Sequence, residues 1–122
     1  MTTVLVTTGR ADFTSVAALC IELAETANPE WYLWVTGDHD ESTILDWAGS
    51  IRVDDRRIRF GPTWHRGENS EMPLEWLGDF TTWIGKSIES LGPSLMVLVG
   101  DRSELLPVAS AALTREIPIA HF

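Results

Sequence analysis

The sequence predicts an α/β fold in which a parallel sheet carries helices on both faces. Short apolar runs, typical of buried parallel strands, alternate with longer segments whose apolar residues recur at helical spacing. The chain has 122 residues, of which 44% are hydrophobic, so it can bury a core. Because strand and helix alternate throughout, we expect residues 1–122 to form one Rossmann-like domain, a doubly wound parallel sheet with strand order 3-2-1-4-5.

The amino-terminal segment predicts a central strand followed by a helix. Residues 4–6 (VLV) are a short apolar run, and Gly9 then breaks the pattern. We expect Asp12 to act as the N-cap of the helix, because a short acidic side chain accepts a hydrogen bond from the first turn. The apolar residues of this helix are Phe13, Val16, Ala17, Cys20, Leu23, Ala24 and Ala27. Asn28-Pro29 is expected to end it.

The next segment predicts a second strand over residues 31–35 and a short helix over residues 42–49. Residues 51–53 and 58–60 both alternate apolar and charged side chains, and one or both are expected to form an edge strand. Residues 61–72, which include Gly61, Pro62, Gly67, Glu68 and Asn69, predict a mobile loop.

The carboxyl-terminal half predicts two more helices and two more strands. Residues 73–91 form a helix that Gly92-Pro93 ends. Residues 95–99 are a continuous apolar run, expected to be a strand buried on both faces. A helix over residues 102–115 and a short strand over residues 117–120 follow.

The helix over residues 73–91 carries an apolar stripe wider than one packing face requires. Its members are Trp76, Leu77, Phe80, Trp83, Ile84, Ile88 and Leu91. Core packing and a subunit interface both explain the two tryptophans. We predict that part of the stripe is buried against a second copy in a twofold homodimer.

Charge and cysteine content exclude several classes of partner. The formal net charge is −9, which argues against nucleic acid or an anionic membrane surface as the main partner, because both need clustered cations. Cys20 is the single cysteine, so no internal disulfide can form, as is usual in a reducing compartment. The first residues lack the pattern of a signal peptide, and no apolar run is long enough to span a bilayer. We therefore expect a soluble, cytoplasmic protein.

Three motif-like segments do not predict the sites that they resemble. Gly9 alone is not the glycine pattern of a dinucleotide-binding turn. Gly85-Lys86-Ser87 is not a P-loop, because Phe80 stands where that motif has its first glycine and the segment lies within a helix. Residues 38–41 (DHDE) are adjacent and have no spaced histidine or cysteine partners for a metal. We expect no cofactor and no metal.

The strongest candidate site follows the fourth predicted strand, where Asp101, Arg102 and Glu104 succeed a glycine. By themselves Asp101 could be a helix cap and the other two solvated charges. However, Arg10 follows the first strand, and the predicted order places both turns side by side at the switch point of the sheet. A guanidinium beside a helix amino terminus suits a diphosphate, and a neighbouring carboxylate suits acid–base chemistry.

Four motifs, taken together, resemble the hydrolysing UDP-N-acetylglucosamine 2-epimerases, especially their sialic-acid branch. They are residues 8–13 (TGRADF), 35–39 (VTGDH), 99–104 (VGDRSE) and 117–121 (IPIAH). The resemblance implies the amino-terminal half of a two-domain, glycosyltransferase-B-like enzyme. Such enzymes bind a UDP-sugar between their domains, eliminate UDP to give a glycal, and add water to release N-acetylmannosamine.

The resemblance also implies roles for individual residues. Asp101 would be a catalytic carboxylate. The substrate-binding residues would be Arg10, Asp12, His39 and Arg102. The residues that support the site would be Gly9, Gly100, Glu104 and His121.

The chain departs from the family pattern at its end. Family members continue past the strand that contains His121 into a Gly-Gly-Glu segment and a second domain, whereas this sequence stops at Phe122. We expect either a fragment or a free-standing half, which folds but does not epimerise alone. The alternative is a non-catalytic Rossmann-like module that binds a partner chain or a nucleotide sugar. The reading frame after Phe122 distinguishes the two.

Overall fold

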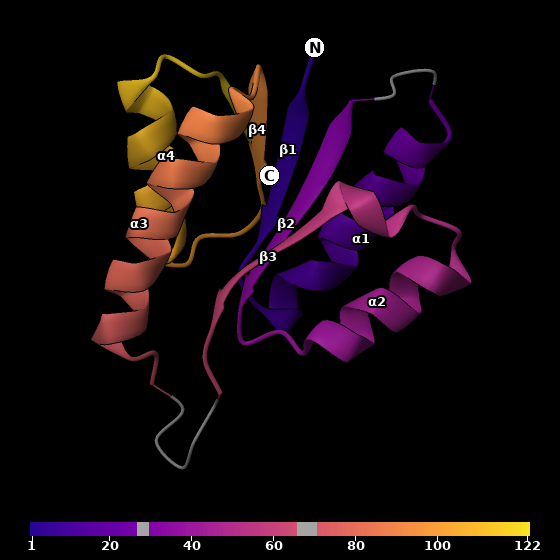
Figure 1. The fold of residues 1–122 in the computed structure, drawn as a ribbon, viewed down its shortest axis with the longest axis horizontal. Helices are drawn as coiled ribbons and strands as arrows, with labels where there is room; N and C mark the ends of the chain where they lie inside the picture. The colour runs from indigo at the N-terminus through magenta and orange to yellow at the C-terminus, as the bar shows by residue number, and fades with distance from the viewer. Residues whose placement is uncertain (27–29, 66–70) are drawn as a thin grey trace.

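The computed structural model describes residues 1–26, 30–65 and 71–122 and shows a five-stranded parallel sheet (Figure 1). The strand order is β3-β2-β1-β4-β5, which confirms the predicted 3-2-1-4-5 order. The elements are β1 (Thr3–Thr7), α1 (Arg10–Ala24), β2 (Trp31–Gly37), α2 (Glu41–Ser50), η1 (Asp55–Arg57), β3 (Ile58–Thr63), α3 (Leu74–Leu91), β4 (Leu95–Leu98), α4 (Leu105–Thr114) and β5 (Ile119–His121).

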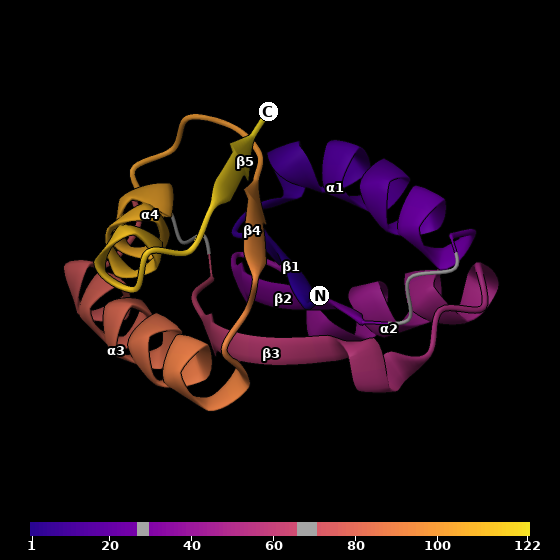
Figure 2. The same cartoon turned by 90° about the horizontal axis from the view of Figure 1, so that it is seen from above.

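The helices form a layer on each face of the sheet (Figure 2). Helices α1 and α2 cover one face, and α3 and α4 cover the other. Right-handed crossovers produce this arrangement, because the chain builds outward from β1 through β2 to β3 and then returns to the other side of β1. The order reverses at β1 and β4, which is where ligands bind in open α/β sheets.

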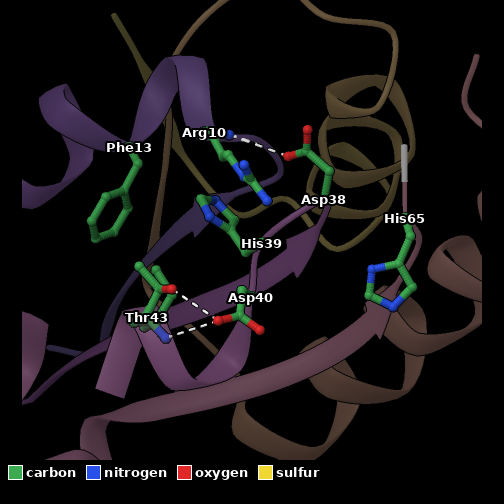
Figure 3. A pocket seen from close by; sticks show the side chains of 8 residues that line it. Arg10, Phe13, Asp38, His39, Asp40, Thr43 and His65 are labelled. Atoms are coloured by element: carbon green, nitrogen blue, oxygen red, sulfur yellow. Dashed lines mark hydrogen bonds between the residues drawn. The ribbon is translucent and has the colours of Figure 1, made fainter. Parts of the chain in front are cut away.

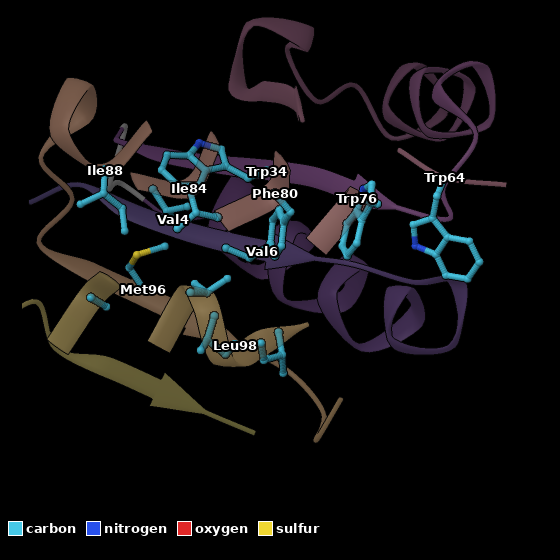
Figure 4. Packing of buried hydrophobic residues seen from close by; sticks show 13 residues of the cluster. Val4, Val6, Trp34, Trp64, Trp76, Phe80, Ile84, Ile88, Met96 and Leu98 are labelled. Carbon is cyan, nitrogen blue, oxygen red and sulfur yellow. The ribbon is translucent and has the colours of Figure 1, made fainter. Parts of the chain in front are cut away.

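Strand β1 is buried along its whole length and separates two hydrophobic clusters. Val4 and Val6 face the cluster under α3 and α4 (Figure 4). Leu5 faces the cluster under α1 and α2. Side chains alternate across a strand, so a strand buried on both faces must be apolar throughout. That requirement explains why β1 and β4 are short, continuous apolar runs.

The wide apolar stripe of α3 is used largely within one protomer. Its buried members are Trp76, Phe80, Ile84 and Ile88. Trp76 stacks on Phe80 with ring centroids 4.9 Å apart, and Trp83 meets Trp34 edge-on at 5.4 Å. Trp76 is only 5% exposed, and Trp83 is half-buried against the same cluster. Core packing therefore accounts for both tryptophans, and the homodimer stays a prediction.

Two predicted helix starts are wrong. Helix α1 begins at Arg10 with Gly9 as its N-cap, so Asp12 lies in the first turn and does not cap the helix. Helix α4 begins at Leu105 and not at residue 102. Pro107 explains the second difference, because it lacks the N–H that the interior of a helix requires and is tolerated only in the first turn.

The other differences lie near the sheet edges. Residues 51–53 are not a strand, because Val53 donates its backbone N–H to Ala48 at the end of α2. Strand β3 instead extends into the predicted loop, as far as Thr63. Strand β4 ends one residue early, and β5 covers Ile119–His121 rather than residues 117–120. Helix α1 ends at Ala24.

Two predictions concern residues outside the described ranges. The helix stop at Asn28-Pro29 lies there, as does the central part of the predicted mobile loop, Gly67, Glu68 and Asn69. In the described part of the chain, no helix combines the length and apolar character needed to cross a bilayer.

Candidate functional site

Three turns meet at the carboxyl ends of the central strands, and glycines allow their close contact. Gly37, at the end of β2, has a φ of +82°, and a Cβ atom there would lie 1.7 Å from the carbonyl oxygen of Thr8. The backbones that follow β1 and β2 are therefore packed directly against each other. Only glycine fits such an approach in a left-handed conformation.

The turns after β1 and β4 also touch, through Gly9 and Gly100. A Cβ atom at Gly9 would lie 2.6 Å from Nη1 of Arg102, so the guanidinium covers this glycine. A Cβ atom at Gly100, which has a φ of +98°, would lie 3.0 Å from Oδ1 of Asp12. Arg102 is thereby held at the amino terminus of α1, and Asp12 against the turn after β4.

A carboxylate from the β2–α2 turn covers the first turn of α1. Gly9, the N-cap, has no side chain that could accept a hydrogen bond. Instead, the backbone N–H of Arg10 donates to Oδ1 of Asp38 over 3.2 Å (Figure 3). Asp38 is 7% exposed, so this carboxylate is fixed within the protein. It takes the place that we predicted for Asp12.

His39 is buried beside this contact and is 5% exposed. Its Nε2 atom lies 2.8 Å from the hydroxyl oxygen of Thr7, within hydrogen-bonding distance, and its ring meets Phe13 edge-on at 5.4 Å. Burial lowers the pKa of His39 below its ordinary value of 6.5, although the Asp38 carboxylate opposes this effect. A neutral imidazole at this place can accept or donate one hydrogen bond.

These side chains border a cavity of about 500 Å³. Its lining residues are Arg10, Phe13, Asp38, His39, Asp40, Thr43, Ile44 and His65 (Figure 3). Asp40 caps α2 by accepting a hydrogen bond from the backbone N–H of Thr43 over 3.3 Å. Hydrogen bonds from Ser42 and Thr43 lower the pKa of Asp40. The volume falls in the range of small-molecule sites.

Three of the predicted site residues lie at the cavity, whereas the predicted catalytic residue does not line it. Arg10 and His39 line the cavity, and Arg102 lies beside it on Gly9. Asp101 is exposed in the turn after β4 and is not one of the described residues that line the cavity.

The supporting residues fix the turn after β4. His121 Nε2 donates to the carbonyl oxygen of Gly100, and Gly100 donates its N–H to Phe122 over 3.0 Å. Within the described residues, buried oxygens of Asp12 and Glu104 have no hydrogen-bond partner. Asp12 lies against the turn at Gly100 and is not one of the described residues that line the cavity.

Several lining residues are not predicted by the sequence pattern. Asp38 and Asp40 fit a polar helix cap, Phe13 fits the core, and His65 has no role in any motif. A positional signal could have found three of them, because Asp38, Asp40 and His65 closely follow the carboxyl ends of β2 and β3. No three His, Cys, Asp or Glu side chains in the described ranges are arranged to hold a metal ion.

Comparison by sequence finds no family model and no curated protein that matches this chain. Comparison by structure does find similar proteins. A UDP-GlcNAc 2-epimerase from Methanocaldococcus jannaschii, in complex with UDP-GlcNAc and UDP, matches with a TM-score of 0.73 and 20% identity over 99% of this chain and 32% of its own. The enzyme from Neisseria meningitidis bound to UDP-GlcNAc matches with a TM-score of 0.71 and 16% identity, over 100% and 32%.

A more distant likeness extends to a ugt transferase from Siraitia grosvenorii in complex with UDP, with a TM-score of 0.54 and 15% identity over 98% of this chain and 27% of its own. The chain thus spans about a third or less of the length of these proteins. At such identities the likeness shows the fold alone. The five-stranded 3-2-1-4-5 sheet matches one half of the glycosyltransferase-B-like fold of the epimerases and glycosyltransferases.

Proposed function

We propose that this chain is the amino-terminal, UDP-sugar-binding domain of a hydrolysing UDP-N-acetylglucosamine 2-epimerase. One observation carries the proposal: at the carboxyl edge of the sheet, Arg10 and His39 line one cavity, and Arg102 reaches the neighbouring Gly9 from a third turn. Structures with the same fold are described as bound to UDP-GlcNAc. The four sequence motifs lie in the turns and strand ends that build this edge.

In this proposal the two arginines bind the diphosphate, and Asp101 takes part in the chemical step. Arg10 and Arg102 supply the cations for a diphosphate, because a guanidinium can donate two parallel hydrogen bonds to phosphate oxygens. Asp101 is the catalytic carboxylate. Its exposed side chain projects from a turn fixed by Gly100, and a second domain of the whole enzyme would close over it.

The reaction itself needs more than one positioned group. Removing the proton at C2 of the sugar while the bond from C1 to the diphosphate oxygen breaks releases UDP and leaves a C1–C2 double bond. Addition of water and return of a proton to the other face of C2 give N-acetylmannosamine. A single carboxylate serves one face only, so Asp101 needs a second positioned group.

The binding test is titration of the chain with UDP-N-acetylglucosamine by isothermal calorimetry. Arg10→Ala and Arg102→Ala should each weaken binding by about ten- to 150-fold, because a hydrogen bond to a charged group contributes about 1.5–3 kcal/mol. Arg115→Ala is the matched control, since Arg115 pairs with Glu89 on the exposed surface of α3 and α4. Absence of binding by the unaltered chain, or an equal loss in the control, would refute the proposal.

The catalytic test uses the two-domain enzyme. Asp101→Asn should abolish release of UDP and N-acetylmannosamine while substrate binding and thermal stability persist. This chain alone should show no sustained turnover, because a closed site is needed to exclude water and clamp the substrate. Multiple turnovers by the 122 residues alone would show that the catalytic groups are assigned wrongly.

A further inference from the structure

The amino terminus of α1 already holds an anion of the protein itself. A helix amino terminus attracts phosphate when its N–H groups are open to a ligand. Here the N–H of Arg10 donates to the Asp38 carboxylate, which reaches α1 from another strand and is 7% exposed. A phosphate could take this hydrogen bond only by displacing a buried carboxylate.

The neighbouring helices carry carboxylates at the same edge. Asp40 occupies the amino terminus of α2, where the hydroxyl groups of Ser42 and Thr43 also donate to it over 2.6 Å and 2.8 Å. Glu104 stands at the N-cap position of α4, with a side chain that is 7% exposed. Helices α1, α2 and α4 therefore each have an acidic side chain at the amino terminus, although Glu104 accepts no cap hydrogen bond there, whereas α3 begins after Pro73.

The charges around the cavity also disfavour an anion inside it. Its lining contains the carboxylates of Asp38 and Asp40 and the guanidinium of Arg10. Burial keeps the pKa of His39 low, so its imidazole adds no charge near neutral pH. Arg102 lies beside Asp38, because Nη1 and Oδ1 approach the Cβ position of Gly9 to 2.6 Å and 3.5 Å. Its positive charge is thus partly offset by the internal carboxylate.

We infer that Asp38 is a specificity-determining residue that excludes phosphate from the α1 amino terminus. The cavity then takes an uncharged, hydroxyl-bearing ring, and a diphosphate lies outside it. Hydroxyl groups of such a ring can donate short, strong hydrogen bonds to the carboxylates in the lining. The rings of Phe13 and His39 form a wall of the cavity against which a sugar ring can pack. This inference rests on the proposed function and names which part of a nucleotide sugar the cavity accepts.

Asp38→Asn tests the inference, because the amide oxygen can still accept the N–H of Arg10 while the negative charge is lost. Inorganic phosphate and N-acetylglucosamine are titrated separately by NMR, following the backbone amides of Arg10 and His39. Phosphate affinity should rise about two- to fivefold, the typical effect of one charge near a helix terminus. Affinity for N-acetylglucosamine should fall. The matched control is Asp40→Asn, which removes a carboxylate from the same lining without opening α1.

Two results would overturn the role of Asp38: unchanged or weaker phosphate binding by Asp38→Asn, or an equal gain by Asp40→Asn. Unmoved resonances of the unaltered chain with N-acetylglucosamine would overturn the assignment of the ring. If Asp38→Asn does not fold, the phosphate titration of the unaltered chain tests the role of Asp38 instead. Millimolar phosphate should leave the NMR resonance of the Arg10 backbone amide unmoved, and a shift of that resonance would overturn the role. Failure of UDP-N-acetylglucosamine to bind, with the phosphate gain present, would refute the proposed function but retain the role of Asp38.

Discussion

Replacing Gly37 by alanine tests the backbone contact that brings the β1 and β2 turns together. Gly37 has a φ of +82°, and an added Cβ would lie 1.7 Å from the oxygen and 2.6 Å from the carbon of the Thr8 carbonyl. Both are backbone atoms of a buried residue that directly follows β1, so they cannot move aside as a flexible side chain would. Gly37→Ala therefore has to shift one turn relative to the other.

The magnitude follows from two separable costs. An alanine in the left-handed region costs about 1–2 kcal/mol. Forcing an extra carbon into a packed site typically adds about 1–3 kcal/mol. Gly92→Ala is the matched control, because Gly92 has a φ of +62° but no described atom lies within 4 Å of its Cβ position. Gly92→Ala should thus show the backbone cost alone.

The assay is urea denaturation followed by the fluorescence of the six tryptophans. Gly37→Ala should lower the free energy of unfolding by about 1–3 kcal/mol more than Gly92→Ala does. It should also weaken ligand binding, because Asp38 and His39 directly follow Gly37, whereas Gly92→Ala at the end of α3 should leave binding unchanged. Equal losses of stability in the two variants would refute the reasoning.

Three further predictions concern the buried contact between Thr7 and His39, the effect of pH on stability, and the oligomeric state. Thr7→Val should cost about 1–3 kcal/mol of stability, because it leaves the buried His39 nitrogen without its partner, and Thr81→Val on the exposed surface should cost less in the same urea assay. Because the pKa of His39 is lowered in the folded protein, the unfolded chain binds more protons than the folded chain as pH falls through 6.5. The contribution of the buried, neutral His39 to stability is therefore present above that pH and is lost below it. His39→Gln should flatten the dependence of the urea midpoint on pH between about 5 and 7, and an unchanged slope would contradict burial of the imidazole as the cause. Sedimentation velocity at micromolar concentration should show a homodimer through α3, and a monomer would refute that prediction.

The sequence by itself determined the type and order of nearly every element. Strands buried on both faces must be apolar at every position, so residues 4–6 and 95–99 could be assigned from local pattern alone. The alternation of strands with helices, together with the handedness of crossovers, restricted the sheet to a few doubly wound orders, of which 3-2-1-4-5 was the one expected. That order placed Arg10 and Arg102 at one edge before any contact was known.

Only the tertiary structure decided which groups meet at that edge. The carboxylate at the α1 amino terminus is Asp38, 28 residues away in the chain, and not the adjacent Asp12. Arg102 reaches α1 because Gly9 leaves space for its guanidinium. Local patterns report which face of an element is buried, but not which distant side chain fills the space beside a given glycine. Capping partners and cavity linings depend on such distant contacts, so they follow from the packed turns and not from the periodicity of the sequence.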